Sequence, residues 1–389
     1  MKTEHLVALF SNSAHIITHM ATILYATAVL HLPHEFGMNY GEMLGLASVG
    51  LILYGVAALP AGWLGDRWSQ IGMMTIFFAG VGIATMIVGL AKTATQLYLG
   101  LSLIGLFAAI YHPVGIAWLI ANTQKQGMTM GINGLCGGIG SAIAAPFVGL
   151  MIDYASWRHA FIVPGIISLL IGITMYLSWR SGSIADIKAE KSRQRTPEAH
   201  AQRRVFMILT LTMACTGFIY AGITHTMPKL FEQGLNSQLA TSYTEVGLYV
   251  GFIVLIASLS SLFGGWLADK VSSRTTYITF WFIAILPLFF ITRMTDVPLL
   301  MLVMTALACI SGFAAAENIL VARYTPFAWR SLAYGAKFVL ALGIGGLTIQ
   351  LAGRMFDGTG DFSQLYLLLG IAAILAAFSA LLLPKEQAA

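Results

Sequence analysis

Charged side chains are scarce in this chain. Asp, Glu, Lys and Arg make up 10% of its 389 residues, whereas hydrophobic residues make up 58%. Soluble globular domains carry roughly 25% charged residues, so the composition excludes a soluble protein. We therefore expect a protein embedded in a lipid bilayer, with no nucleic-acid partner and no appended soluble domain. The first apolar run is too long and too polar to resemble a cleaved signal peptide.

Reactive and nucleotide-binding features are also missing. The 3 cysteines, Cys136, Cys215 and Cys309, all fall within apolar runs, where they are more typical of packing than of disulfide pairing. No GxxxxGK[ST] phosphate-binding loop occurs, so the chain cannot itself use ATP. No acid, nucleophile or metal-ligand cluster gathers at one membrane face. We therefore predict no enzyme activity and no cofactor.

Long apolar runs fill most of the chain. A helix needs about 20 predominantly apolar residues to cross a bilayer, and we predict twelve such spans. They are 6–30, 43–65, 71–91, 96–121, 126–152, 159–179, 205–228, 246–268, 275–292, 298–322, 330–353 and 362–383. The result is an all-α polytopic membrane protein.

The only long polar interval is 180–204, and it is rich in Lys and Arg. It divides the chain into an N-terminal six-helix bundle (1–180), a linker (181–204) and a C-terminal six-helix bundle (205–389). With both termini in the cytoplasm, most of the 21 Lys and Arg lie on the cytoplasmic side, as the positive-inside rule requires. We expect a multi-pass protein of the inner (plasma) membrane that is monomeric in the lipid bilayer.

Two stretches of the sequence are near repeats. Residues 39–42 (NYGE) open an apolar run that closes with 62–67 (GWLGDR), and residues 242–245 (SYTE) open one that closes with 265–270 (GWLADK). Each Glu follows an Asn or Ser by three positions, the pattern of a helix N-terminal capping box. Both copies place ~36 Å of helix between Glu and Asp, enough to cross a bilayer. The chain is predicted to be a duplication.

Twelve spans, a basic central linker and the doubled GWLGDR/GWLADK motif resemble the major facilitator superfamily over the whole chain. The family's loop usually continues into Gly and basic residues, whereas this chain has Trp68-Ser69-Gln70. The resemblance implies two six-helix bundles around a central cavity that opens to each side in turn. It also implies that the motif residues gate the cavity; these are Asp66, Arg67, Asp269 and Lys270.

Two further motifs refine the resemblance. Residues 107–113 (FAAIYHP) are similar to helix 4 of the fosmidomycin-resistance type of exporter, but Val114 stands where that group has an acid. The glycines and Pro146 of segment 126–152 are similar to the Gly-Pro motif of the superfamily's antiporters, with Ala145 in place of a Gly. The two motifs favour antiport and export.

Polar residues share one face of the first span. They recur at helical spacing: Asn12, His15, His19 and Thr22. His15 and His112 each lie ~15 Å from the ends of their helices, and the family resemblance places both helices beside the cavity. The imidazoles can be neutral and hydrogen-bonded, can titrate, or can bind substrate. Cys136 at a similar depth would add a soft ligand, but no ligand pair has a motif spacing, so we predict no metal site.

The second half contains two charges well inside predicted spans, Glu317 and Lys337. Each costs about 2.5–3.5 kcal/mol at a helix centre unless it has a partner or faces a cavity. Their matched depth on consecutive helices lets them meet. A permanent ion pair, a pair that titrates or exchanges with substrate, and independent roles all remain open. Tyr220, within a stripe of Thr residues in span 205–228, is the remaining candidate for the pathway.

These features together predict a secondary active transporter that moves a small organic solute by alternating access, with proton-coupled export favoured. Lys337 favours a different substrate and direction, the uptake of a small organic anion or carboxylate. A receptor or enzyme that has kept the fold without transport is the alternative from another class. The expected partners are the substrate, protons and the lipid bilayer.

Overall fold

The chain folds into helices throughout the part that is described. The computed structural model describes residues 3–123, 126–186, 199–324, 337 and 339–384. Twelve of its helices, some of them interrupted, are long and apolar enough to cross a membrane. The predicted all-α class and the twelve spans are therefore confirmed.

The first bundle contains the helices up to residue 180. They are α1 (Thr3–Ala28), α2 (Leu32–Phe36), α3 (Tyr40–Gly45), α4 (Ser48–Val56), α5 (Ala58–Arg67), α6 (Gln70–Gly89), α7 (Ala94–Ala108), the π-helix η1 (Tyr111–Gly115), α8 (Ile116–Ala121), α9 (Gln126–Tyr154) and α10 (Trp157–Arg180). Large aromatic side chains fill its core, among them Phe77, Phe78 and Trp118.

The second bundle contains the helices from residue 199 onward. They are α11 (Ala199–Gly234), α12 (Tyr243–Lys270), α13 (Ser273–Phe290), the short 3-10 helix η2 (Ile291–Arg293), α14 (Asp296–Gly312), α15 (Ala314–Tyr324), the π-helix η4 (Val339–Gly343), α17 (Ile344–Thr359) and α18 (Ser363–Leu381). Helix α11 begins before the predicted 205, inside the predicted linker. The remainder of that linker from 187 onward, and positions 330–336 of the eleventh predicted span, lie outside the described residues.

The single second span predicted at 43–65 is three helices. Its break after Val56 has a clear cause, because Pro60 has no N–H to bond the carbonyl of Val56 and its ring crowds that carbonyl. The corresponding helix of the second repeat, α12, contains no proline and is continuous. Pro113 of the fourth span lies in the π-helix η1, a local change of helix geometry of the kind that proline causes.

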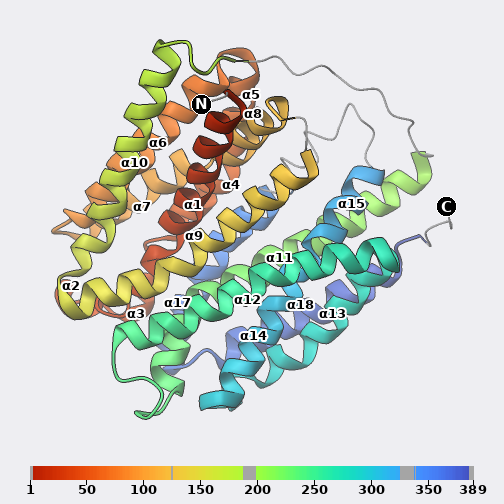
Figure 1. Cartoon of the computed structure of the whole chain (residues 1–389). Helices are drawn as coiled ribbons and strands as arrows, with labels where there is room; N and C mark the ends of the chain where they lie inside the picture. The colour runs from red at the N-terminus through yellow and green to blue at the C-terminus, as the bar shows by residue number, and fades with distance from the viewer. Residues whose placement is uncertain (1–2, 124–125, 187–198, 325–336, 338, 385–389) are drawn as a thin grey trace.

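The two bundles meet where α9 packs on α12 and where α3 and α4 pack on α17, with α4 also contacting η4 and α1 contacting α11. Figure 1 shows the bundles converging near α2 and α3 and diverging toward the end where the N-terminus lies. We call that diverging end, which also holds the start of the linker, the linker side, and the converging end the far side.

Helix N-termini on the far side are capped by carboxylates from the other bundle. Asp357 of α17 accepts hydrogen bonds from the backbone N–H groups of Gly41 and Glu42 at 2.8 and 3.0 Å. Asp153 of α9 accepts from the N–H of Thr244 at 2.7 Å and from its hydroxyl at 2.6 Å. The two caps are equivalent in the two repeats, and they hold the far side closed.

Both predicted capping boxes are also present. Glu245 accepts a hydrogen bond from the N–H of Ser242, whose hydroxyl accepts from the N–H of Glu245, each at 3.2 Å. In the first copy Glu42 accepts from the N–H of Asn39 at 3.0 Å. The repeat thus begins both spans in the same way.

The space around each glycine shows where the two bundles are in contact. A Cβ on Gly149 would lie 2.2 Å from the carbonyl oxygen of Tyr243, and one on Gly353 would lie 2.4 Å from that of Gly41. Nearer the linker side of α9, a Cβ on Gly131 or Gly134 would meet no described atom within 4 Å. The bundles are therefore in backbone contact on the far side and apart on the linker side.

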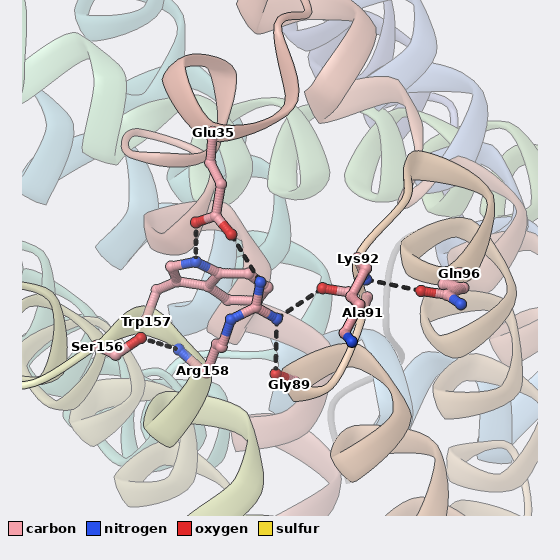
Figure 2. Close-up of polar contacts among 8 residues, drawn as sticks. All are labelled: Glu35, Gly89, Ala91, Lys92, Gln96, Ser156, Trp157 and Arg158. Atoms are coloured by element: carbon pink, nitrogen blue, oxygen red, sulfur yellow. Dashed lines mark hydrogen bonds and ion pairs between the residues drawn. The ribbon is translucent and has the colours of Figure 1, made fainter.

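A cluster around Arg158 ties together three far-side connections of the first bundle (Figure 2). Its guanidinium pairs with Glu35 at 2.7 Å and donates to the backbone carbonyls of Gly89 and Ala91 at 3.1 and 2.6 Å. The indole N–H of Trp157 donates to the other oxygen of Glu35. Asp153, near the end of the preceding helix α9, contacts the other bundle instead.

We expect Arg158→Ala to lower the thermal unfolding midpoint more than Glu35→Gln does. The half-exposed ion pair itself contributes only about 0–1 kcal/mol, whereas Arg158→Ala also leaves two backbone carbonyls without their charged donor, at about 1.5–3 kcal/mol each before solvent compensates. Unfolding of the two purified variants in the same detergent measures the difference. Equal midpoints would show that the carbonyl contacts contribute nothing.

Candidate functional site

A cavity of about 330 Å³ lies between the bundles. Its volume is in the range of small-molecule sites. It is lined by His15, His19, Gly134, Gly137, Gly138, Ser141, Thr216, Tyr220, Ser258, Ser261, Ile310, Ser311, Phe313, Ala314, Glu317 and Lys337. Five of the six residues predicted for the pathway are therefore in its wall, and both bundles contribute to it.

The sixth, His112, lies immediately behind the wall. Its ring centroid is 5.4 Å from that of His15 and 5.5 Å from that of His19. The Nε2 atoms of His15 and His19 are 3.1 Å apart. The three imidazoles thus form one cluster on the first-bundle side of the cavity; the spacing in the first span predicted the shared face of His15 and His19, and the family resemblance placed His112 beside the same space.

Hydrogen bonds from neighbouring helices orient this cluster. Nδ1–H of His15 donates to the backbone carbonyl of Asn133 at 2.7 Å. The side-chain oxygen of Asn133 accepts from the Tyr111 hydroxyl at 2.9 Å, and Nε2 of His112 is 2.9 Å from the hydroxyl of Tyr54. Helices α9 and α4 therefore orient the rings, and Tyr111 of η1 supports Asn133.

Glu317 and Lys337 meet on the other side of the cavity. Oε2 of Glu317 is 2.5 Å from Nζ of Lys337, and the two side chains are 2% and 16% exposed. Tyr277 of α13 donates its hydroxyl to Oε1 of Glu317 at 2.9 Å, and Lys337 donates to the side-chain oxygen of Asn318 at 2.7 Å. The predicted contact between the two charges is present, and Lys337 is the member that solvent can reach.

A comparison of the sequence with known families decides the class of protein. The profile of the Major Facilitator Superfamily matches residues 12–241 and 230–389. The chain belongs to the Major Facilitator Superfamily. It is therefore a multi-pass membrane transporter of small solutes and not an enzyme, as the doubled motif predicted.

Relatives of this superfamily member include two sugar-acid transporters. A probable L-galactonate transporter of Escherichia coli (strain K12) is 25% identical over 274 residues, which is 66% of the chain and 59% of that protein. That match spans less than two thirds of the relative. The D-galactonate transporter of Escherichia coli O6:H1 is 25% identical over 392 residues, covering 92% of the chain and 90% of that protein.

The same fold is found in a solved structure of the nucleoside transporter NupG. It aligns with a TM-score of 0.76 at 14% identity, over 97% of the chain and 100% of that structure. A likeness at this identity shows the fold alone. The finer resemblance to fosmidomycin-resistance exporters stays a prediction.

The predicted gating residues lie at the linker side, away from the cavity. Asp66 and Arg67 end α5, and Asp269 and Lys270 end α12. Arg67 packs over the ring of Trp63, 4.6 Å from its centroid. Among the described residues, neither Asp66 nor Asp269 forms an ion pair. Their gating role was expected when the linker side is closed, and it stays a prediction.

The predicted Thr stripe of the seventh span is only partly in the cavity wall. Thr216 and Tyr220 line the cavity, but Thr212 and Thr224 are buried and donate to the carbonyls of Ile208 and Tyr220 at 3.1 and 2.7 Å. A threonine hydroxyl can bond the carbonyl one turn earlier in its own helix. Helical spacing alone therefore predicted more cavity-lining residues on this helix than the structure has.

Other residues of the site were not predicted. Asn133, Tyr277 and Asn318 contact the histidines or the ion pair, and four serines line the cavity: Ser141, Ser258, Ser261 and Ser311. The polar run 258–261 (SLSS) inside an apolar span is a signal that could have found two of them. Tyr277 carried no such signal.

Proposed function

We propose that this protein transports a small hydroxylated organic acid, with Lys337 as the residue that binds the carboxylate. The single observation that carries the proposal is the position of Lys337, a partly exposed cation in the wall of the cavity between the bundles. An ammonium in a membrane is retained only where it has a partner or a function. A substrate carboxylate is such a partner.

Hydroxyl groups around the cation support a hydroxylated substrate. Four serines, Thr216 and Tyr220 line the same cavity as Lys337. Hydroxyls both donate and accept hydrogen bonds, so they can match the hydroxyls of a sugar acid. The relatives named for L-galactonate and D-galactonate support this substrate class.

Exchange at the ion pair gives a mechanism for proton coupling. When a substrate carboxylate binds Lys337, Glu317 loses its cation while remaining 2% exposed. An unpaired carboxylate at that depth is costly, so Glu317 takes up a proton. Tyr277 holds the carboxyl in place during the exchange. One proton then accompanies each acid.

We assign the linker side to the cytoplasm, because the linker and adjacent loops are rich in Lys and Arg. Both termini then lie on the cytoplasmic side of the plasma membrane. The described state is then open to the cytoplasm and closed outside by the Asp153 and Asp357 caps. Movement of an acid with protons down their gradient from outside gives uptake.

Export is the second candidate, and the Gly-Pro motif of α9 favours it. Pro146 of that motif packs against Gly251 of α12, where an added Cβ would lie 2.7 Å from Cγ of the proline ring. The motif therefore belongs to the interface that rearranges during transport. Protonation of Glu317 frees Lys337 for an acid instead of displacing it, so in the export reading the acid and the proton leave together, driven by an outward gradient of the acid.

Binding and counterflow with matched ligands test the proposal. Purified protein is heated with D-galactonate, L-galactonate or D-galactose, which lacks the carboxylate, and proteoliposomes preloaded with each compound are assayed for counterflow. We expect the acids to raise the unfolding midpoint and to exchange, and galactose to do neither. An equal response to galactose, or a response only to lipophilic cations, would overturn the carboxylate assignment. A pH gradient of each sign in the same vesicles identifies the direction.

A further inference from the structure

Three histidines of the first bundle converge in a way that neither the ion pair nor the hydroxyls of the cavity require. His15 and His19 are one turn apart on α1, and His112 comes from η1. One ring nitrogen from each lies within 4.8 Å of the other two. Among the described residues this is the one group of histidines, cysteines or acids that could hold a metal ion.

The hydrogen bonds around His15 prepare one nitrogen as a ligand. Its Nδ1–H donates to the carbonyl of Asn133, so in the neutral ring Nε2 carries the lone pair. That Nε2 accepts a hydrogen bond from Nε2–H of His19 at 3.1 Å, and a metal ion takes the place of this proton when His19 adopts its other neutral tautomer. Metal-bound histidines commonly donate their other N–H to a backbone carbonyl, which fixes the ring and raises its basicity. Asn133 gives His15 that support.

The distances fit a small tetrahedral ion. Zn²⁺ bonds histidine nitrogen at about 2.0–2.1 Å, which places two ligands of a tetrahedron roughly 3.3 Å apart. His15 and His19 already have this separation, and His112 reaches it by a ring movement of about 1–2 Å, since its nitrogen starts within 4.8 Å. Nitrogen ligands select Zn²⁺, Cu²⁺, Ni²⁺ and Co²⁺ over Mg²⁺ and Ca²⁺.

We propose that His15, His19 and His112 form a divalent transition-metal site of the Zn²⁺ class, with its fourth position open to the central cavity. His15 and His19 are in the cavity wall, so an ion bound to them faces the same space as Lys337. A carboxylate oxygen of the substrate completes the coordination, and this last step alone depends on the proposed function. The site revises the prediction from sequence that the chain binds no metal.

Metal titration of the full chain, purified through a tag without histidine and stripped with a chelator, tests the site. Co²⁺ is added first, because its visible absorption is strong in a tetrahedral site, and Zn²⁺ is then used to displace it. We expect one ion per chain. His19→Gln and His112→Gln each weaken Zn²⁺ binding at least tenfold, whereas the control His225→Gln, a buried histidine of α11 in the other bundle, leaves it unchanged.

A second measurement keeps the test sharp if a variant fails to fold. X-ray absorption of the Zn²⁺-loaded wild type should show three nitrogen ligands at about 2.0–2.1 Å and no sulfur. Binding should also weaken in acid, because protons compete with the ion for the imidazole nitrogens. The absence of a stoichiometric ion at micromolar Zn²⁺, a sulfur ligand, or equal binding by wild type and His19→Gln would each overturn the site.

Addition of D-galactonate to the Co²⁺ form separates this inference from the proposed function. A changed visible spectrum supports the open fourth position. If Co²⁺ binds with the expected spectrum but neither D-galactonate nor L-galactonate alters it or exchanges in proteoliposomes, the metal site stands and the substrate class is wrong. If the acids exchange but no ion binds, the transport function stands and the metal site is wrong.

Discussion

Lys337→Met should lower acid counterflow at least 100-fold, Glu317→Gln should lower proton-driven uptake at least 100-fold, and each should lower the unfolding midpoint by several degrees. Removing one member of a buried pair strands the other charge, at a cost of about 3–5 kcal/mol. Glu317 is 2% exposed and Lys337 is 16% exposed, so solvent screens neither well. The loss of stability should be larger in Lys337→Met, because the stranded Glu317 is 2% exposed, whereas the Lys337 stranded by Glu317→Gln is 16% exposed and better hydrated.

The double variant Glu317→Gln, Lys337→Met distinguishes a structural pair from a functional one. Replacement of both members by neutral residues removes the stranded charge and can be nearly neutral for stability. We expect the wild-type unfolding midpoint to return and transport to stay absent, because no cation remains for the carboxylate. Glu35→Gln, which breaks an ion pair remote from the cavity, serves as the control and should transport within twofold of wild type. If the double variant carries out full proton-driven transport, the pair has only a structural role.

This pair was predictable because its geometry is local. Glu317 and Lys337 lie on consecutive spans joined by a short connection, so their positions along the chain fix their depths. The same reasoning placed His15 and His19 on one face of α1. Depth and helix face follow from spacing alone, and those parts of the site were predicted from the sequence.

Contacts between distant helices could not be predicted in the same way. Tyr277 and Asn133 come from spans remote from their partners, and their contacts depend on how far each helix is rotated about its own axis. Packing sets that rotation, and apolar periodicity is a weak guide to it where a helix is apolar on all sides. Buried Thr212 shows the converse error, since a polar residue at the correct spacing can be satisfied by its own helix.

The contacts between bundles explain how the two repeats can alternate. Asp153 and Asp357 cap equivalent helices across the far side, and glycines bring the backbones into contact beside them. The predicted gating acids lie at the linker-side ends of the two copies of the repeat, Asp66 at the end of α5 and Asp269 at the end of α12. We propose that the two sets work alternately, one closing each side, so that weakening one set favours the opposite state.

Gly149→Ala should shift the protein away from the described state and lower transport at least tenfold. A Cβ at this position lies 2.2 Å from the carbonyl oxygen of Tyr243, so α9 and α12 must separate on the far side. Overpacking of this kind costs about 1–3 kcal/mol, and each 1.4 kcal/mol changes a population ratio tenfold. Alanine is otherwise favoured over glycine in a helix by roughly 0.8–1.0 kcal/mol, so a loss must come from the contact.

Gly131→Ala on the same helix is the matched control, because a Cβ there meets no described atom within 4 Å. Spin labels at Tyr154 and Asp361, exposed residues of the two bundles on the far side, report the separation in a background without the 3 native cysteines. Gly149→Ala should lengthen the measured distance and Gly131→Ala should leave it at the wild-type value. Both variants share the same gain in helix propensity, so a difference between them isolates the contact with Tyr243. If Gly149→Ala keeps the wild-type distance distribution and full transport, the far side does not close through this contact. The proposed alternation of the two sets of contacts would then have no structural basis.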